Sequence, residues 1–299
     1  MNTWFIRFFS LVLIVSLMAS LTAFASEIDC EQYKNPKTRQ AVELVYEAAD
    51  LLKTKGKSAF KEFSTKGSRW FNGDRYIFVH AMDGKLLCNG AFPSMVGSNM
   101  IDFRGVAGKP IVRFMIDEVT LYGRDNGWVH YLWPKPGEIE PSWKSTFVHL
   151  VKGPDGQRYI VGMGLYEVPM ERCFAVEQVE EAAWYVERRG AKVFDLFHSK
   201  DGPFLWKNSY VFIIGMDGIG YVNPINRSLE GKDVKDLMDE RGFKFVQKMQ
   251  EVLREKEAGW VEYMWPKPGF IAAYKKHTYT KLVRSGGKEY MIGCGIYLD

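Results

Sequence analysis

The 299-residue sequence has none of the motifs that mark the common enzyme classes. Its five histidines show no H-E-x-x-H pattern or other zinc spacing, and the chain has no G-x-S-x-G elbow, Walker loop or EF-hand loop. The Gly162-x-Gly164 pair is followed by a predicted strand end and not by a helix, so it does not fit a nucleotide-binding turn. We therefore expect no catalytic site, no metal and no cofactor.

Charge of one sign is not in large excess either. The 40 Lys and Arg residues against 36 Asp and Glu residues give a formal net charge of +4. No run of basic residues is interleaved with aromatic residues, which is the pattern that binds nucleic acid. We therefore expect no nucleic-acid partner.

Cysteine is scarce, with only four residues in the chain. Their spacings match no paired C-x-x-C metal pattern. Cys88 and Cys294 lie in apolar, strand-like runs, which favours buried free thiols. Cys30 and Cys173 each lie shortly before a predicted helix, and a disulfide between them is a hypothesis for an oxidising compartment.

The N-terminus has the layout of a secretory signal peptide. Arg7 precedes an apolar run over residues 8–21, and Ala23-Phe24-Ala25 provides a small-x-small cleavage pattern. The alternative is an uncleaved membrane anchor, although the run is short against the roughly 20 apolar residues that cross a bilayer. We predict a cleaved signal peptide over residues 1–25 and a periplasmic or secreted mature protein.

A long motif occurs twice in the chain. Residues 127–137 read Gly-Trp-Val-His-Tyr-Leu-Trp-Pro-Lys-Pro-Gly, and residues 259–269 repeat them with two differences at a constant offset of 132. The Met-Asp-Gly sequence at residues 82–84 returns at residues 216–218, an offset of 134, so small length changes fall in loops. Self-similarity at a fixed period indicates duplicated structural units. We predict two domains, residues 39–169 and 174–299.

Each copy has the same predicted order of elements. A helix is followed by a two-stranded hairpin at the Met-Asp-Gly turn, then by a long segment with a second helix, and finally by three strands. In the first copy the helices are predicted at residues 41–55 and 111–122, and the strands at 76–81, 86–88, 128–133, 145–151 and 159–166. This order predicts an α+β fold, in which each domain is a five-stranded antiparallel sheet with an N-terminal helix and covering helices and loops.

The strand and turn motifs resemble those of a known family. The relevant blocks in the first copy are Tyr76-x-Phe-Val79, Met82-Asp-Gly84, residues 96–102, Gly108-Lys-Pro110, the repeated tryptophan motif, Lys144-Ser-Thr-Phe147 and Gly164-Leu-Tyr166. Over nearly all of residues 40–299 this pattern resembles tandem Cache domains of the type-two single-Cache variety. The resemblance implies a PAS-like extracytoplasmic sensor fold that binds a small organic ligand, often a carboxylate or an amino acid. The resemblance also implies a module of the kind that sits on chemoreceptors, histidine kinases or cyclases. We expect a membrane sensor kinase, chemoreceptor or transporter as the partner.

The repeated tryptophan motif supplies the first candidate binding residues. Alternation along a strand places Tyr131 and Trp133 on one face, and Tyr263 and Trp265 on the equivalent face of the second copy. Tyrosine and tryptophan bring a polar group to an apolar wall, which small-ligand pockets use. The alternative is that these side chains simply fill a core.

A lysine begins the next strand in both copies. Lys144 and Lys276 could donate a charge-assisted hydrogen bond to a carboxylate, and Tyr279 follows three residues after the second of them. Residues three apart on a regular strand point to opposite faces, so Lys276 and Tyr279 can share a pocket only if the strand is irregular. The alternative is that both lysines are solvated strand ends.

Three further polar residues complete the candidate site. Asn89 and Asn223 follow the second strand of each hairpin, where they could contact a ligand or only support a turn. His80 lies on the same strand face as Tyr76 and Phe78, where it could be a ligand contact or a satisfied core residue. Two functions stay open from these residues. One is an exported protein that binds a small organic ligand, and the other is an interaction protein whose pockets are vestigial.

Overall fold

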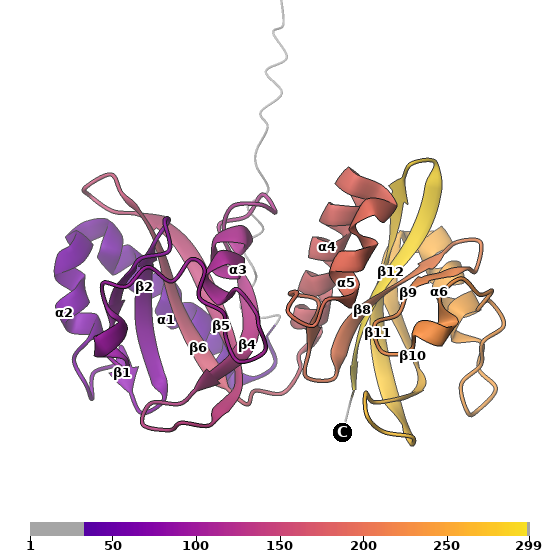
Figure 1. Ribbon diagram of the computed structural model, residues 1–299, viewed down its shortest axis with the longest axis horizontal. Coiled ribbons are helices and arrows are strands. Elements are labelled where there is room, and N and C mark those ends of the chain that lie inside the picture. Colours follow the sequence, from indigo (N-terminus) through magenta and orange to yellow (C-terminus); the bar gives the residue numbers. More distant parts are fainter. Residues whose placement is uncertain (1–32, 298–299) are drawn as a thin grey trace, which may run out of the picture.

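The computed structural model describes residues 33–297, and they form two similar sheet-and-helix domains that lie side by side (Figure 1). The predicted signal peptide and Cys30, with its hypothetical disulfide to Cys173, lie outside the described residues. Cys88, Cys173 and Cys294 are free thiols, and the first and last of these are buried. No helix among residues 33–297 is both long and apolar enough to cross a membrane.

The elements of the first domain run from residue 36 to residue 166. They are α1 (Pro36–Lys55), a 3₁₀ turn (Gly56–Ala59), α2 (Phe60–Phe63), β1 (Phe71–Asn72), β2 (Arg75–Ala81), β3 (Leu86–Asn89), a 3₁₀ turn (Pro93–Met95), α3 (Ile111–Glu118), β4 (Asn126–Pro134), β5 (Pro141–Lys152) and β6 (Arg158–Tyr166).

The second domain repeats this order. Its elements are α4 (Arg172–Arg189), a 3₁₀ turn (Gly190–Val193), α5 (Phe194–His198), β7 (Leu205–Trp206), β8 (Ser209–Gly215), β9 (Gly220–Val222), a 3₁₀ turn (Arg227–Leu229), α6 (Phe245–Lys256), β10 (Ala258–Pro266), β11 (Ala273–Ser285) and β12 (Lys288–Tyr297).

The predicted α+β fold is confirmed, and every strand pairing in both sheets is antiparallel. The strand order is β1-β2-β6-β5-β4 with β3 also paired to β2, and β10-β11-β12-β8-β7 with β9 also paired to β8. The five predicted strands of each copy are therefore present, and the two-residue strands β1 and β7 extend them. Gly84 and Gly218, at φ +89° and +91°, make the hairpin turns that the Met-Asp-Gly repeat predicts.

The helix ends follow local signals in the sequence. α1 begins five residues before its predicted start because the Asn35 side chain accepts a hydrogen bond from the amide of Lys37 and Pro36 opens the first turn. It ends at Gly56, as predicted, where φ is +54°. α3 ends at Glu118 and not at residue 122, and its C-terminal cap is Val119.

Each sheet has a different cover on each face. The long helix α1 packs on one face, where Ile77 and Val79 of β2 belong to its core. Tyr76 and Phe78 point to the other face and pack with residues of α3 and of the loop before it. The second domain has the same layers, with α4 on one face and α6 on the other. Period-two alternation along β2 and β8 thus separates a helix-packed core from a face covered by a short helix and a loop.

The two domains meet through the cover of the first and the long helix of the second. α3 faces α4 in Figure 1. His130 of β4 stacks on Trp206 of β7, with the rings 3.6 Å apart and 3° from parallel, and both side chains are buried. Glu262 takes the place of His130 in the second copy of the tryptophan motif, and there it forms surface ion pairs with Lys275 and His277. The domain interface thus explains one of the two differences within that repeat.

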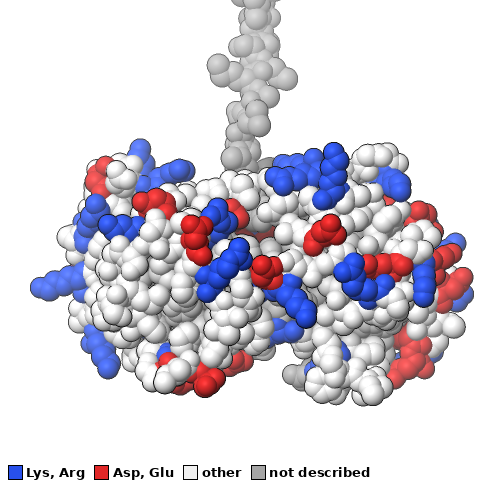
Figure 2. All heavy atoms as spheres, in the orientation of Figure 1, with Lys and Arg blue, Asp and Glu red and all other residues white. Residues whose placement is uncertain are grey.

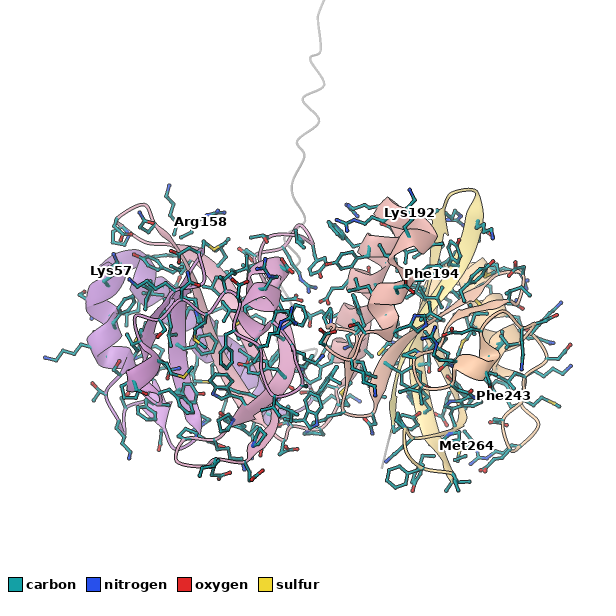
Figure 3. The ribbon with its side chains drawn as sticks, viewed as in Figure 1. Lys57, Arg158, Lys192, Phe194, Phe243 and Met264 are labelled. Atoms are coloured by element: carbon teal, nitrogen blue, oxygen red, sulfur yellow. The ribbon has the colours of Figure 1, made fainter. Side chains whose placement is uncertain are left out.

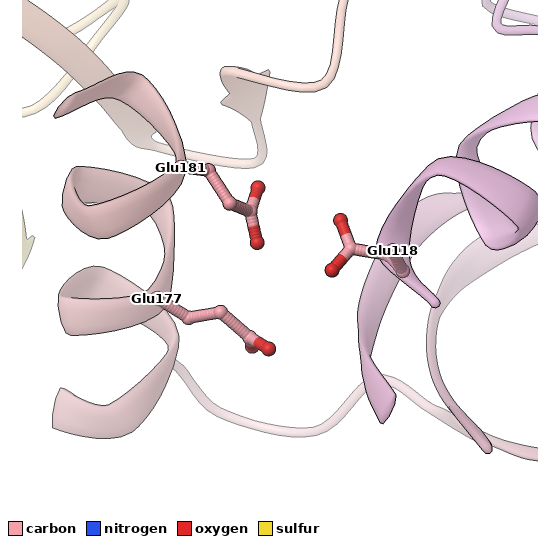
Figure 4. A group of neighbouring side chains, drawn as sticks. All are labelled: Glu118, Glu177 and Glu181. Carbon is pink, nitrogen blue, oxygen red and sulfur yellow. The ribbon is translucent and has the colours of Figure 1, made fainter. Parts of the chain in front are cut away.

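A buried charge cluster lies in the same interface. Glu118 of α3 points toward Glu177 and Glu181 of α4, with carboxylate oxygens within 4.8 Å of one another (Figure 4). Arg124 forms ion pairs with all three glutamates. On the face of the molecule shown in Figure 2, by contrast, acidic and basic residues are interspersed.

Candidate ligand-binding pockets

Each domain has a cavity between its sheet and the short helix that covers it. The room left for the centre of a water-sized sphere is small, about 30 Å³ in the first domain under α3 and about 30 Å³ in the second under α6. All of the residues predicted from the sequence except Tyr279 line these cavities. They are His80, Asn89, Tyr131, Trp133 and Lys144 in the first domain, and Asn223, Tyr263, Trp265 and Lys276 in the second.

A buried lysine reaches into each cavity. Lys144 Nζ donates a hydrogen bond of 2.6 Å to the hydroxyl of Tyr76, and Lys276 Nζ donates one of 3.1 Å to Tyr210. Both lysines are only 1% exposed, so neither is a solvated strand end. Within residues 33–297, no carboxylate forms an ion pair with either ammonium. A buried cation without a counter-ion is costly, and an anion in the cavity would offset that cost.

Two tyrosine rings enclose each ammonium. Lys144 Nζ lies 4.1 Å from the ring centroid of Tyr76 and 4.9 Å from that of Tyr166, and Lys276 is placed alike between Tyr210 and Tyr297. Tyr166 is fixed in turn, because its hydroxyl donates to the carbonyl of Pro134 at 2.8 Å. The Tyr297 hydroxyl donates to Pro266 in the same way, at 2.7 Å. The Trp-Pro step of the repeated motif therefore anchors the wall around the lysine.

Glycines on the neighbouring strand make room for the lysines. A Cβ atom on Gly164 would lie closer than 3.0 Å to Cε of Lys144, and one on Gly295 would meet Cε of Lys276 in the same way. Gly162 and Gly293 make room for the rings of Phe78 and Phe212. The Gly-x-Gly pair, which fits no nucleotide-binding turn, thus leaves space for the side chains that pack on the neighbouring strands. The sequence contains the signal, since Gly-x-Gly-x-Tyr is repeated in both copies.

Hydrogen bonds also fix the aromatic wall. The hydroxyl groups of Tyr131 and Thr146 are 2.9 Å apart, and Thr278 donates to Tyr263 at 3.0 Å. Such bonds hold a buried tyrosine ring in one orientation. The tyrosines and tryptophans of the repeated motif therefore form rigid walls, with the cavity between them and the cover.

Asn89 and Asn223 hold the turn after the second strand through their side-chain oxygens. Asn89 Oδ1 accepts hydrogen bonds from the amides of residues 91 and 92, and Asn223 Oδ1 accepts from those of residues 225 and 226. Neither side-chain NH₂ group has a hydrogen-bond partner within the described part of the chain. Because both residues line a cavity, the turn role leaves these donors available to a ligand.

The two lysines differ in their acidity. Burial lowers the pKa of Lys144 to about 7, close to the physiological range. Burial also opposes the charge on Lys276, but the phenol oxygens of Tyr210, Tyr263 and Tyr297 outweigh it and raise the pKa of that lysine above its ordinary value. The second cavity therefore keeps its positive charge over a wider pH range than the first.

Tyr279 does not line either cavity, and its prediction as a pocket residue is corrected here. β11 is paired regularly with β10 and β12 along this stretch, so Tyr279 and Lys276 point to opposite faces of the sheet. The Tyr279 hydroxyl donates to Glu180 of α4 at 3.4 Å, and its ring packs against Trp260. It belongs to the helix-packed core.

Some lining residues were not predicted from the sequence. Tyr76 and Tyr210, which hold the lysines, were recognised only as part of a repeated Tyr-x-Phe pattern. Glu230 lines the second cavity and accepts hydrogen bonds from the amide of Asn223 at 2.8 Å and from His198 at 2.6 Å. The repeat gave no signal for Glu230, because Val96 stands at that place in the first copy.

Two of the solved structures that match this chain are described as sensory domains. A Cache chemosensory domain described for carboxylic acid recognition is 27% identical, with 40% of this chain and 84% of that chain covered and a TM-score of 0.34. The periplasmic sensory domain of the Campylobacter jejuni chemoreceptor Tlp1 is 10% identical, with 87% of each chain covered and a TM-score of 0.27.

The sequence comparisons cover different shares of the chain. The methyl-accepting chemotaxis protein McpP of Pseudomonas putida is 35% identical over 78 residues, which are 26% of this chain and 14% of that protein. A family model of the Cache domain matches residues 26–171 and 203–299, so it spans most of both domains. This match confirms the resemblance seen in the sequence motifs: the chain belongs to the Cache domain family.

Proposed function

We propose that this chain is an extracytoplasmic sensor whose two pockets each bind a small organic carboxylate. One observation carries the proposal: in both domains a fully buried lysine, which has no carboxylate partner within residues 33–297, faces a cavity with aromatic walls. The duplicated motifs preserve this arrangement although much of the rest of the two copies has diverged.

The groups around each lysine suit a carboxylate. One ligand oxygen would accept a charge-assisted hydrogen bond from the ammonium, which is roughly twice as strong as a neutral one. The side-chain NH₂ of Asn89 or Asn223 offers a further donor, and the tyrosine and tryptophan rings would pack on the carbon skeleton. Each cavity leaves only about 30 Å³ of room for a water-sized sphere, which favours a compact guest.

The alternative of an interaction protein with vestigial pockets requires side chains to fill both cavities. The free space is small, about 30 Å³ in each pocket, and it is the buried lysines, each without a carboxylate partner within residues 33–297, that support binding over that alternative. The chemotaxis protein of P. putida supports a sensory role, with a membrane chemoreceptor, sensor kinase or transporter as the partner that reads the ligand. We include periplasmic export and the absence of catalysis in the proposal.

Thermal-shift measurements with short carboxylic acids and amino acids test the proposal. A ligand that binds only the folded protein raises the melting temperature by linkage, with about 2.7 kcal/mol of stabilisation at 100 times its Kd. We expect Lys144→Ala and Lys276→Ala each to weaken one site about 10- to 100-fold. Lys152→Ala, an exposed position on the same strand as Lys144, is the matched control. No shift with any acid at millimolar concentration would refute the proposal.

A further inference from the structure

The two cavities differ most at the end away from the lysine. Tyr76, Phe78 and His80 alternate along β2 and all line the first cavity. The Tyr76 hydroxyl accepts a hydrogen bond from Lys144, and His80 lies four residues further along the same strand, with a Cα spacing of about 13 Å at roughly 3.3 Å per residue. The first cavity is therefore lined by both a cation and an imidazole.

His80 presents a hydrogen-bond acceptor to this cavity. Its Nδ1 lies 3.4 Å from the carbonyl oxygen of Gly84, so Nδ1 carries the proton and Nε2 is the acceptor of the neutral ring. Within residues 33–297, Nε2 has no hydrogen-bond partner. The side chain is only 4% exposed, and burial lowers the pKa of His80 to about 4, which keeps the ring neutral.

The second cavity has no such acceptor at this place. Ile214 occupies the position of His80, and both residues follow a register shift between their strand and the next, after Val79 and after Ile213. A bulge at the same point gives both side chains the same direction. Other residues that line this cavity are apolar, namely Val222, Leu229, Val234, Leu237 and Phe245.

Glu230 does not supply the missing polar group. Its carboxylate accepts hydrogen bonds from the amide of Asn223, from His198 and from Arg227, the last at 3.3 Å. These contacts fix the turn beside Asn223 and offset the negative charge. The distal end of the second cavity is therefore left to Ile214 and its apolar neighbours.

We propose that the first pocket selects a carboxylate with a terminal hydroxyl group, which donates to Nε2 of His80, whereas the second selects an unsubstituted aliphatic carboxylate. This inference rests on the proposed function. A ligand without the hydroxyl would leave the buried Nε2 without a partner, which disfavours it.

Isothermal titration with 5-hydroxypentanoate and pentanoate tests the assignment, one pocket at a time. The Lys276→Ala variant reports the first pocket, and we expect it to bind the hydroxy acid about tenfold more tightly than pentanoate. Adding His80→Ile should abolish this preference. The Lys144→Ala variant reports the second pocket, where pentanoate should bind more tightly, and adding Ile214→His should shift the preference toward the hydroxy acid by about tenfold.

The outcomes separate this inference from the function on which it rests. If neither acid binds the two lysine variants or the wild type, carboxylate binding itself fails. If the acids bind but the preferences stay the same after both exchanges, the pockets bind carboxylates and the role of His80 is refuted. Should His80→Ile fail to fold, the Ile214→His exchange decides alone: a gained preference supports the assignment, and an unchanged one overturns it.

Discussion

The covers of the two pockets have the same place in each domain but different surroundings. In the first domain, Lys109 just before α3 donates hydrogen bonds to the carbonyls of Gly202 and Leu205, the latter at 3.0 Å, and is 1% exposed. Its counterpart 134 residues later is Phe243, which is 39% exposed before α6 and lies on the side away from the first domain (Figure 3). Duplication has therefore produced one cover that is tied to a neighbouring domain and one that is not.

The last residue of α3 also ties the cover of the first pocket to the neighbouring domain. Glu118 belongs to the buried cluster of three glutamates and Arg124, while Ile111, Val112 and Met115 of the same short helix line the first cavity. Burial raises the pKa of Glu177 to about 8 against the opposing effect of Arg124. The helix α3 thus contributes both to a pocket and to the domain interface. In that interface, the three carboxyl groups pair with one cation, Arg124.

Removing that cation should have the largest effect. We expect Arg124→Ala to reduce the free energy of unfolding by about 3–5 kcal/mol, because three buried carboxyl groups lose their only ion-pair partner in the cluster. Denaturant unfolding measures this loss. Lys256→Ala, at the equivalent place 132 residues later and exposed at the end of α6, should cost less than about 0.5 kcal/mol. Equal losses of stability in the two variants would show that Arg124 does not stabilise the buried glutamate cluster.

The second-largest effect should come from placing a methyl group against the buried lysine, and it should lower stability in both domains alike. Gly295→Ala places a Cβ against Cε of Lys276, so we expect a loss of about 2–3 kcal/mol in stability and weaker carboxylate binding in the second pocket. Gly164→Ala should act in the same way on the first.

A double-mutant cycle isolates the clash. Gly295→Ala combined with Lys276→Ala should cost clearly less than the sum of the two single changes, because the truncated side chain no longer meets the new methyl group. Additive losses in denaturant unfolding would contradict the packing role of the glycine.

Exchanging the two cover residues tests the docking contact directly. Lys109→Phe should lose about 1–2 kcal/mol in stability, because the carbonyls of Gly202 and Leu205 lose their buried donor. Phe243→Lys changes a partly exposed side chain and should alter stability by less than about 0.5 kcal/mol. Thermal unfolding of both variants gives the comparison, and a similar loss in both would remove the distinction between the covers.

The smallest expected effect is a difference in pH dependence. The charged lysine is the form that attracts an anion, and Lys144 loses its proton as the pH rises through about 7. Affinity of the first pocket for a carboxylate should therefore fall between pH 6 and pH 8, by at most about tenfold per pH unit. The raised pKa of Lys276 should leave the second pocket unchanged over this range. Titrations with Lys276→Ala and Lys144→Ala proteins measure each pocket, and parallel pH profiles would contradict the prediction.

Much of the fold could be predicted because the chain carries two copies of one pattern. The order of elements, the antiparallel sheets and the cavity-facing side of Tyr131 and Trp133 all follow from local periodicity that the second copy repeats. Lys144 and Lys276 were predicted for the same reason, at the same place in both copies. What these residues bind remains a proposal.

The sequence did not reveal features that depend on contacts across the chain. His130 and Trp206 stack although they are far apart in sequence, and only the docking of the two domains brings them together. Tyr279 was misplaced because its hydroxyl was given more weight than the alternation of the strand. Glu230 gave no signal, since its hydrogen bonds to Asn223 and His198 appear only after β9 and α5 have packed.

The path of the two lysines across their sheets has a thermodynamic consequence. A surface lysine gives up as much as about 2 kcal/mol of rotamer entropy when it grips an anion. Here the stems of Lys144 and Lys276 lie over glycine on the next strand, with a tyrosine ring on each side of the ammonium, so folding has already removed that freedom. Association then demands little further ordering from the protein. A guest with only a handful of heavy atoms, which can bury little surface, could for this reason still be held firmly.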